Sequence, residues 1–150
     1  YEGGNGNGPE LGMLSLEEGK IIDDTCAKNG LVDICKKLYP SYAGTTRIRL
    51  ESLTPEIIFT AANNNDALAL KAFEKLGVKL GEALAIFIML FDITTIYIGG
   101  GISPSFKYLE DPIKEKLKLN LTKYYLDNLV IEEASLGNDS GILGAAALCF

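Results

Sequence analysis

Residues 67–104 contain an ordered run of signals that limits the possible folds more than any other part of this sequence. An interior-strand pattern, Ile93–Ile98 (ITTIYI), is rich in β-branched residues. Gly99, Gly100 and Gly101 end this strand, and Ser103-Pro104 is typical of a helix start, with Ser as the cap. Before the strand, apolar residues recur at helical spacing: Leu68, Ala72, Leu76, Leu80, Ala83, Phe87 and Phe91. The order helix, buried strand, glycine loop, helix predicts an α/β domain.

The remaining segments extend this pattern on both sides. The second half of the long helix is apolar all round, so we expect it to be buried on most sides. Asn63–Asp66 is expected to end a preceding helix and to cap the long one. The small residues Ala145–Ala147 predict close packing of the last helix on a neighbour. The other expected elements are two hairpin strands, Gly12–Leu16 and Lys20–Asp23, a helix Asp24–Tyr39, a helix opening at Thr54-Pro55, a strand Leu129–Ala134 and a closing helix Gly141–Phe150 capped by Asn138–Ser140.

Length and composition exclude several classes of function. A chain of 150 residues fits one domain, and its net charge of −6 argues against nucleic acid or an anionic membrane surface as the main partner. There is no histidine, which removes the commonest general base and metal ligand. Cys26, Cys35 and Cys149 are too few and too scattered for a tetrahedral zinc site or a disulfide framework. The cysteine count and the short apolar runs predict a cytoplasmic protein without a membrane span.

The glycines that follow the strands are the first candidates for ligand contact. Glycine lets the backbone approach a ligand, and the helix behind Gly99–Gly101 presents free N–H groups. Open α/β sheets bind ligands beyond the carboxyl ends of their strands. Gly137 and Gly141 also follow a predicted strand and could serve the same ligand. The alternative is a tight strand-to-helix turn, because neither a Walker lysine nor a G-x-G-x-x-G spacing is present.

Three segments together resemble one family. The segment GNGPELGML is similar to the G-x-x-G-E-x-G-H stretch of ROK-type sugar kinases and bacterial glucokinases. The segment LFDITTIYIGGGIS resembles their adenosine motif, and ASLGNDSGILGAAAL resembles their closing motif. The resemblance covers nearly the whole chain and implies the carboxyl-terminal half of a ribonuclease H-like (actin-like ATPase) fold, a partial mixed sheet flanked by helices. It also implies that an amino-terminal half is absent, and with it the phosphate loop and the aspartate general base, so that no catalytic residue lies in this chain.

The resemblance also implies roles for individual residues. Glu10 matches the glutamate that binds sugar hydroxyls, and Asp23 falls where the family has a second sugar-binding acid. Met13 stands where the family has a histidine that contacts the sugar and, in many members, zinc. Gly99–Gly101 correspond to the adenosine loop, and Gly137 and Gly141 to the closing motif. Read from the residues alone, Glu10 could be an exposed acid in a glycine loop and Asp23 an acid near a helix amino terminus.

The resemblance implies an ATP-dependent hexose kinase of carbohydrate metabolism, glucokinase-like, with Mg²⁺ carried on the ATP phosphates. Met13 favours the alternative, which is a non-catalytic sugar-binding effector domain of a ROK-type transcriptional repressor or a pseudokinase. We expect the 150-residue chain alone to lack kinase activity and to bind no zinc. The expected partners are a hexose, ATP, the missing amino-terminal half and a second copy in a homodimer, but neither nucleic acid nor a membrane.

Overall fold

The computed structural model describes residues 4–6, 8–136 and 140–147, without the side chains of residues 140 and 141. A single long helix, α4 (Ala67–Phe91), runs through the middle of the molecule. The buried Asp66 caps it, since its carboxylate accepts hydrogen bonds from the backbone N–H groups of Leu68 and Ala69. Asp92 ends it in the left-handed conformation, with φ of 51°. The predicted helix and its cap are confirmed.

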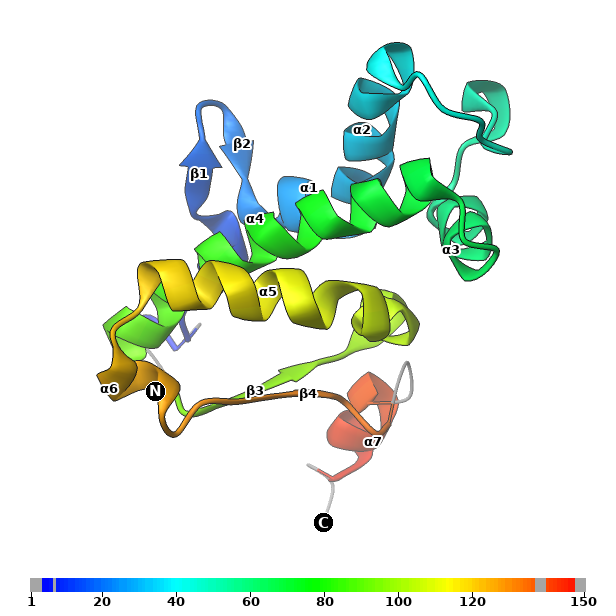
Figure 1. Cartoon of the computed structure of the whole chain (residues 1–150). Helices are drawn as coiled ribbons and strands as arrows, with labels where there is room; N and C mark the ends of the chain where they lie inside the picture. Colours follow the sequence, from blue (N-terminus) through cyan, green and yellow to red (C-terminus); the bar gives the residue numbers. More distant parts are fainter. Residues whose placement is uncertain (1–3, 7, 137–139, 148–150) are drawn as a thin grey trace.

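Helix α5 (Phe106–Asn120) packs along α4 at close range (Figure 1). Two buried glycines of α4 face it, and neither position has room for a side chain. A Cβ atom on Gly77 would lie 2.6 Å from Cγ of Pro112, and one on Gly81 would lie 2.7 Å from Cβ of Lys116. The missing side chains of α4 therefore let the two helix backbones approach each other.

A two-stranded parallel sheet lies against this helix pair. Strand β3 (Thr95–Ile98) pairs with β4 (Val130–Glu133) in register from Thr95↔Val130 to Ile98↔Glu133. The crossover between them runs through α5 and the short helix α6 (Lys123–Leu126). Ile96, Ile98 and Ile131 contact the core, whereas Tyr97 on the opposite face is 64% exposed. One face of the sheet is therefore covered by helices and the other is open.

The opposite side of α4 carries the amino-terminal elements (Figure 1). The hairpin β1 (Ser15–Glu17) and β2 (Lys20–Ile21) leads into α1 (Ile22–Cys26), α2 (Lys28–Leu38) and, after a mostly irregular connection, α3 (Pro55–Asn63). The prediction of one helix over Asp24–Tyr39 is wrong, because the backbone is extended at Ala27. Gly30 lies against the carbonyl of Thr25, so the break lets α2 fold back tightly on α1. The predicted cap of α3 is confirmed, as Thr54 Oγ1 accepts from the Ile57 N–H.

Other predicted details differ from the structure. The hairpin strands are shorter than predicted, because Leu11–Met13 forms a 3₁₀ turn and helix α1 begins at Ile22. Ser103-Pro104 lies in a 3₁₀ helix, Gly100–Ser105, and α5 begins after it. The end of α4 is not buried on most sides: the exposed fractions of Met89, Leu90 and Phe91 are 48%, 63% and 44%.

The last described helix is α7 (Ser140–Ala147). Residues 142–147 are exposed, so the close packing predicted for Ala145–Ala147 is not found. Among the described residues, no helix is both long and apolar enough to cross a membrane.

Two hydrophobic clusters hold these elements together. The main cluster joins α2, α3, α4, α5 and β4, and its fully buried members include Leu31, Ile58, Phe73, Leu76 and Leu109. The small cluster joins α1 to the other side of α4, through Ile22, Cys26 and Ala83. The hairpin rests on the small cluster, and the glycine loop rests on the main one.

Candidate functional site

The predicted sugar-binding residues lie at one end of the hairpin. Glu10 precedes the 3₁₀ turn Leu11–Met13, and its carbonyl accepts a hydrogen bond from the Met13 N–H at 3.1 Å. The side chain of Glu10 is exposed, and that of Met13 is 61% exposed. Both side chains are therefore accessible to a ligand from solvent.

Asp23 joins this group through Gly12. A Cβ atom built on Gly12 would lie 2.1 Å from Oδ1 of Asp23 and 2.5 Å from its Cγ. The carboxylate of Asp23 therefore rests on the backbone of the segment between Glu10 and Met13. Any larger residue at position 12 would displace it, which gives a physical reason for glycine there.

The hairpin is what brings these distant positions together. The Ile22 N–H donates to the Leu14 carbonyl at 2.8 Å, so the residues before β1 lie beside the residues after β2. The Ser15 hydroxyl lies 2.5 Å from the Glu17 carbonyl oxygen on its own strand and 2.8 Å from the Lys20 carbonyl oxygen across the turn. Antiparallel pairing thus places Glu10 and Asp23, thirteen positions apart in sequence, at the same end of one hairpin.

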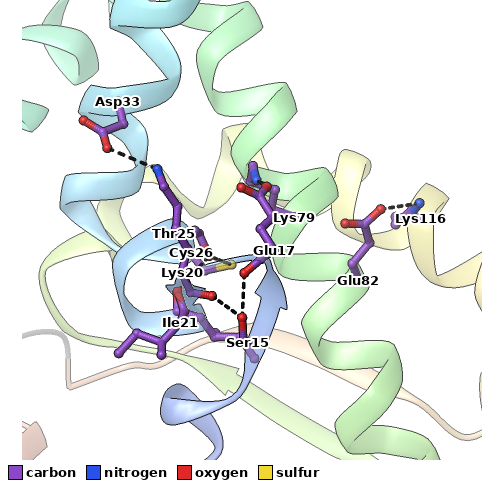
Figure 2. Close-up of polar contacts among 11 residues, drawn as sticks. Ser15, Glu17, Lys20, Ile21, Thr25, Cys26, Asp33, Lys79, Glu82 and Lys116 are labelled. Carbon is purple, nitrogen blue, oxygen red and sulfur yellow. Dashed lines mark hydrogen bonds and ion pairs between the residues drawn. The ribbon is translucent and has the colours of Figure 1, made fainter.

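Two ion pairs fasten the hairpin to the helices (Figure 2). Glu17 at the end of β1 pairs with Lys79 of α4. Lys20 at the start of β2 lies 3.9 Å from Asp33 of α2. All four side chains are at least one-quarter exposed, so water screens both pairs. The turn end of the hairpin is therefore held by charge, and the predicted sugar-binding residues Glu10 and Asp23 flank its opposite end.

The described cysteines do not supply a nucleophile. Burial raises the pKa of the Cys26 thiol, and the charges of Glu82 and Asp23 raise it further, against a hydrogen bond with Thr25 that lowers it. Burial likewise raises the pKa of Cys35 to about 11. Both side chains are thus protonated at neutral pH, and a protonated thiol is a poor nucleophile.

The glycine loop forms the second candidate ligand element. Gly100 has φ of +72°, a backbone conformation that favours glycine. Gly99 lies in an extended conformation close to Ala134, just beyond β4. The loop then enters the 3₁₀ helix, where Ser103 and Ser105 are buried. The predicted loop is therefore a sharp turn at the carboxyl end of the parallel sheet.

A small cavity of about 160 Å³ opens beside Gly101. Its apolar wall comes from Leu31 of α2, Phe59 of α3 and Ile102 of the loop. Lys28 and Glu56 line it as well, and Lys28 Nζ lies 3.8 Å from Glu56 Oε1. Hydrogen bonds from the backbone N–H of Glu56 and the Thr54 hydroxyl lower the pKa of the Glu56 carboxyl, and Lys28 lowers it further. The cavity therefore combines an apolar wall with one positive and one negative charge.

Sequence reasoning singled out Gly101 of this cavity but not its side chains. Lys28, Glu56 and Phe59 come from helices that are distant from the loop in sequence, and no local pattern marks them. The extended backbone at Ala27 is what directs Lys28, the first residue of α2, to the glycine loop. The predicted sugar-binding residue Asp23 thus lies in the first turn of the short helix α1, and Lys28 begins the next helix, α2.

The closing motif is less completely described. Gly137 lies outside the described residues, and Gly141 lies within α7. In the part of the chain that the structure describes, no group of three or more His, Cys, Asp or Glu side chains could hold a metal ion.

Comparisons with known proteins lead to one family. Residues 1–150 match the model of the ROK family. A glucokinase of Halalkalibacterium halodurans is 28% identical over 97% of this chain and 48% of its own length. The DNA-binding transcriptional dual regulator NagC of Escherichia coli is 30% identical over 99% of this chain and 38% of its own length. The chain therefore spans about half or less of the length of these curated relatives.

Solved structures also match this chain. A predicted sugar kinase from Cytophaga hutchinsonii covers 99% of this chain with a TM-score of 0.87 and 34% identity, over 50% of its own length. A ROK family glucokinase from Streptomyces griseus, solved with glucose and AMPPNP, covers 95% of this chain and 51% of its own, with a TM-score of 0.82 and 22% identity. The expected actin-like ATPase fold class is confirmed.

Proposed function

Because the chain belongs to the ROK family, we propose that it is the carboxyl-terminal, sugar- and nucleotide-binding half of an ATP-dependent hexose kinase. The observation that carries this proposal is the contact between Asp23 and Gly12, which sets the Asp23 carboxylate against the backbone two positions after Glu10. A hexose presents several hydroxyl donors, and carboxylates accept hydrogen bonds from such donors.

In this proposal Glu10 and Asp23 fix the orientation of the hexose. Each ionised carboxylate accepts from sugar hydroxyls, and such charge-assisted hydrogen bonds are stronger than neutral ones. Met13 adds an exposed thioether where a weakly polar contact with the sugar ring is possible. The chain's own residues thus bind and position the acceptor, and the general base belongs to the missing amino-terminal half.

The glycine loop would receive the nucleotide. Glycine at residues 99–101 lets backbone lie against a ribose or phosphate, and the adjoining apolar cavity would hold the flat face of the base. ATP supplies the γ-phosphoryl group, and Mg²⁺ on its phosphates needs few protein ligands. Catalysis of such a transfer depends mainly on positioning and charge neutralisation, so both elements must be in place at the same time when the phosphoryl group is transferred.

The similarity to NagC supports a second candidate function, a sugar-binding effector domain of a transcriptional repressor. Met13 agrees with this candidate, because it replaces a histidine expected in the kinase pattern. The hairpin carboxylates would then bind the inducer sugar, and no phosphoryl transfer would follow.

Coupled ADP release by the full-length protein tests the proposal. The kinase hypothesis predicts turnover that depends on one of glucose, mannose, fructose or an N-acetyl sugar, and none from the 150-residue chain alone. Loss of a general base typically slows such a reaction by ~10²–10⁴-fold. Sugar binding without turnover, together with sugar-sensitive DNA binding, would replace the kinase by the repressor. Robust sugar-dependent turnover by the 150-residue chain would contradict the assignment of the general base to the missing half.

We further propose that the protein is cytoplasmic and forms a homodimer. The exposed apolar residues at the end of α4, Met89, Leu90 and Phe91, provide apolar surface for self-association. Light scattering should show a dimer, and a monomer at high concentration would contradict the homodimer.

A further inference from the structure

One lysine lies directly on the glycine loop. A Cβ atom built on Gly101 would lie 2.4 Å from Cε of Lys28 and 2.6 Å from its Nζ. The ammonium group therefore rests against the loop backbone. It reaches this position because the extended backbone at Ala27 separates α1 from α2, and Lys28 begins α2.

The ammonium group is weakly held by the protein. Its ion partner is Glu56, at 3.8 Å, which is too long for a hydrogen bond. The side chains of Lys28 and Glu56 are 50% and 71% exposed. An exposed pair at this distance contributes little to stability, so an anionic ligand can replace Glu56 as the partner of Lys28.

The surroundings of Lys28 favour a ligand with one apolar part and one anionic part. Leu31, Phe59 and Ile102 form an apolar wall, which suits a flat heterocycle better than a sugar. Lys28 supplies a positive charge at the edge of this wall, beside backbone that a phosphate could approach. Lysine binds phosphate as a point charge.

We propose that Lys28 binds a phosphate group of the nucleotide at the glycine loop, exchanging its contact with Glu56 for the phosphate. This inference rests on the proposed function, because it concerns the nucleotide site of that function. It adds to the proposed nucleotide site a positively charged side chain, which the glycine motifs do not predict. Glu56 then acts as a competitor that holds Lys28 in the ligand-free protein.

Binding of ADP and of adenosine to the full-length protein separates phosphate contact from base contact. Lys28→Met retains the stem and removes the charge, so we expect ADP affinity to fall about tenfold, the lower end for a charge-assisted contact. Adenosine affinity should not change, because adenosine has no phosphate. Glu56→Gln should raise ADP affinity slightly, since Lys28 loses its competitor. Lys28→Arg should retain most of the ADP affinity.

Lys36→Met is the matched control, because Lys36 is an exposed lysine in the last turn of the same helix, far from its beginning. It should leave both affinities unchanged. Unchanged ADP affinity in Lys28→Met would overturn the inference. Equal losses for ADP and adenosine would also overturn it, because they would indicate a packing role. Wild-type protein that binds neither ADP nor adenosine would instead remove the proposed nucleotide site itself.

Discussion

The glycine loop, residues 99–101, and the β1–β2 hairpin, which Glu10 and Asp23 flank, are stabilised by different contacts. The loop follows a parallel strand that packs on the main hydrophobic cluster, through Ile96 and Ile98 of β3 and Ile131 of β4. The hairpin rests on the small cluster of Ile22, Cys26 and Ala83, and on exposed ion pairs to α2 and α4. The comparison indicates that the proposed nucleotide element shares the stability of the whole domain, whereas the proposed sugar element can open by itself.

This difference has a direct consequence for mutations. A change in the main cluster should weaken both ligand elements together, because both depend on α4. A change at the hairpin should weaken the sugar element alone. The following predictions test this division, beginning with the largest expected effect.

Phe73→Ala should destabilise the entire domain. Phe73 is fully buried and stacks on Tyr108 with ring centroids 5.3 Å apart. Its truncation should lower the free energy of unfolding by about 3–5 kcal/mol. Denaturant unfolding measures this loss, and Leu119→Ala at an 81% exposed position of α5 is the control. A loss near that of the control would contradict the assignment of Phe73 to the main cluster.

Asp66→Ala should cost less than Phe73→Ala but still act on the whole domain. The buried carboxylate of Asp66 accepts from Thr46 Oγ1 and from the N–H groups of Arg47, Leu68 and Ala69. Its removal leaves buried donors without a partner, at a cost of about 1–3 kcal/mol. Equal unfolding midpoints in Asp66→Ala and the wild type would contradict this account of the cap.

Asp66 also predicts a pH dependence. Burial raises its pKa, but the hydrogen bonds from Arg47, Thr46, Ala69 and Leu68 outweigh burial, so the pKa falls below the ordinary 3.8. A lowered folded-state pKa means that Asp66 stabilises the fold above about pH 4, and that this contribution is lost as the pH falls further. Asp66→Asn should therefore flatten the acid limb of stability against pH. An unchanged acid limb would contradict the lowered pKa.

Lys79→Met should have the smallest effect on stability and a local one. The exposed pair with Glu17 contributes about 0.2–1 kcal/mol. The Ile22 amide donates to the Leu14 carbonyl, and its hydrogen exchange should accelerate. The opening free energy derived from this exchange should fall by roughly the contribution of the ion pair. The Ala134 amide beside the glycine loop should not change, and Lys118→Met on α5 is the control variant. Equal acceleration at both amides would show that the two regions open together.

The sequence predicted elements whose signals are local. The long helix, its Asp66 cap and the Thr54 cap follow from apolar spacing and from side chains that bond nearby N–H groups. The strands β3 and β4 agree with the predictions Ile93–Ile98 and Leu129–Ala134 to within two residues, and the hairpin turn was predicted as well, although its strands are shorter than predicted. The ROK-type motifs predict Glu10, Asp23 and Gly99–Gly101 as site residues, which stays a prediction; the structure places Asp23 against Gly12.

The features that sequence reasoning missed depend on contacts between distant elements. The break at Ala27 comes from the packing of Gly30 on Thr25, which no local propensity reveals. The exposed end of α4 has an apolar sequence, which predicts burial whether or not a neighbour is present. Lys28 and Glu56 line the cavity beside the glycine loop because helices α2 and α3 meet there, and lysine on a helix usually faces solvent.

Calorimetric titration of the full-length protein and of Glu10→Gln tests the central claim that the hairpin is the sugar element and the glycine loop is separate from it. Loss of charge-assisted bonds worth about 1.5–3 kcal/mol predicts hexose affinity lower by roughly one to two orders of magnitude. The affinity for an ATP analogue should remain unchanged. Asp23→Asn should act in the same direction with a smaller effect, and the double variant should depart from additivity. Unchanged hexose affinity in Glu10→Gln would contradict the claim.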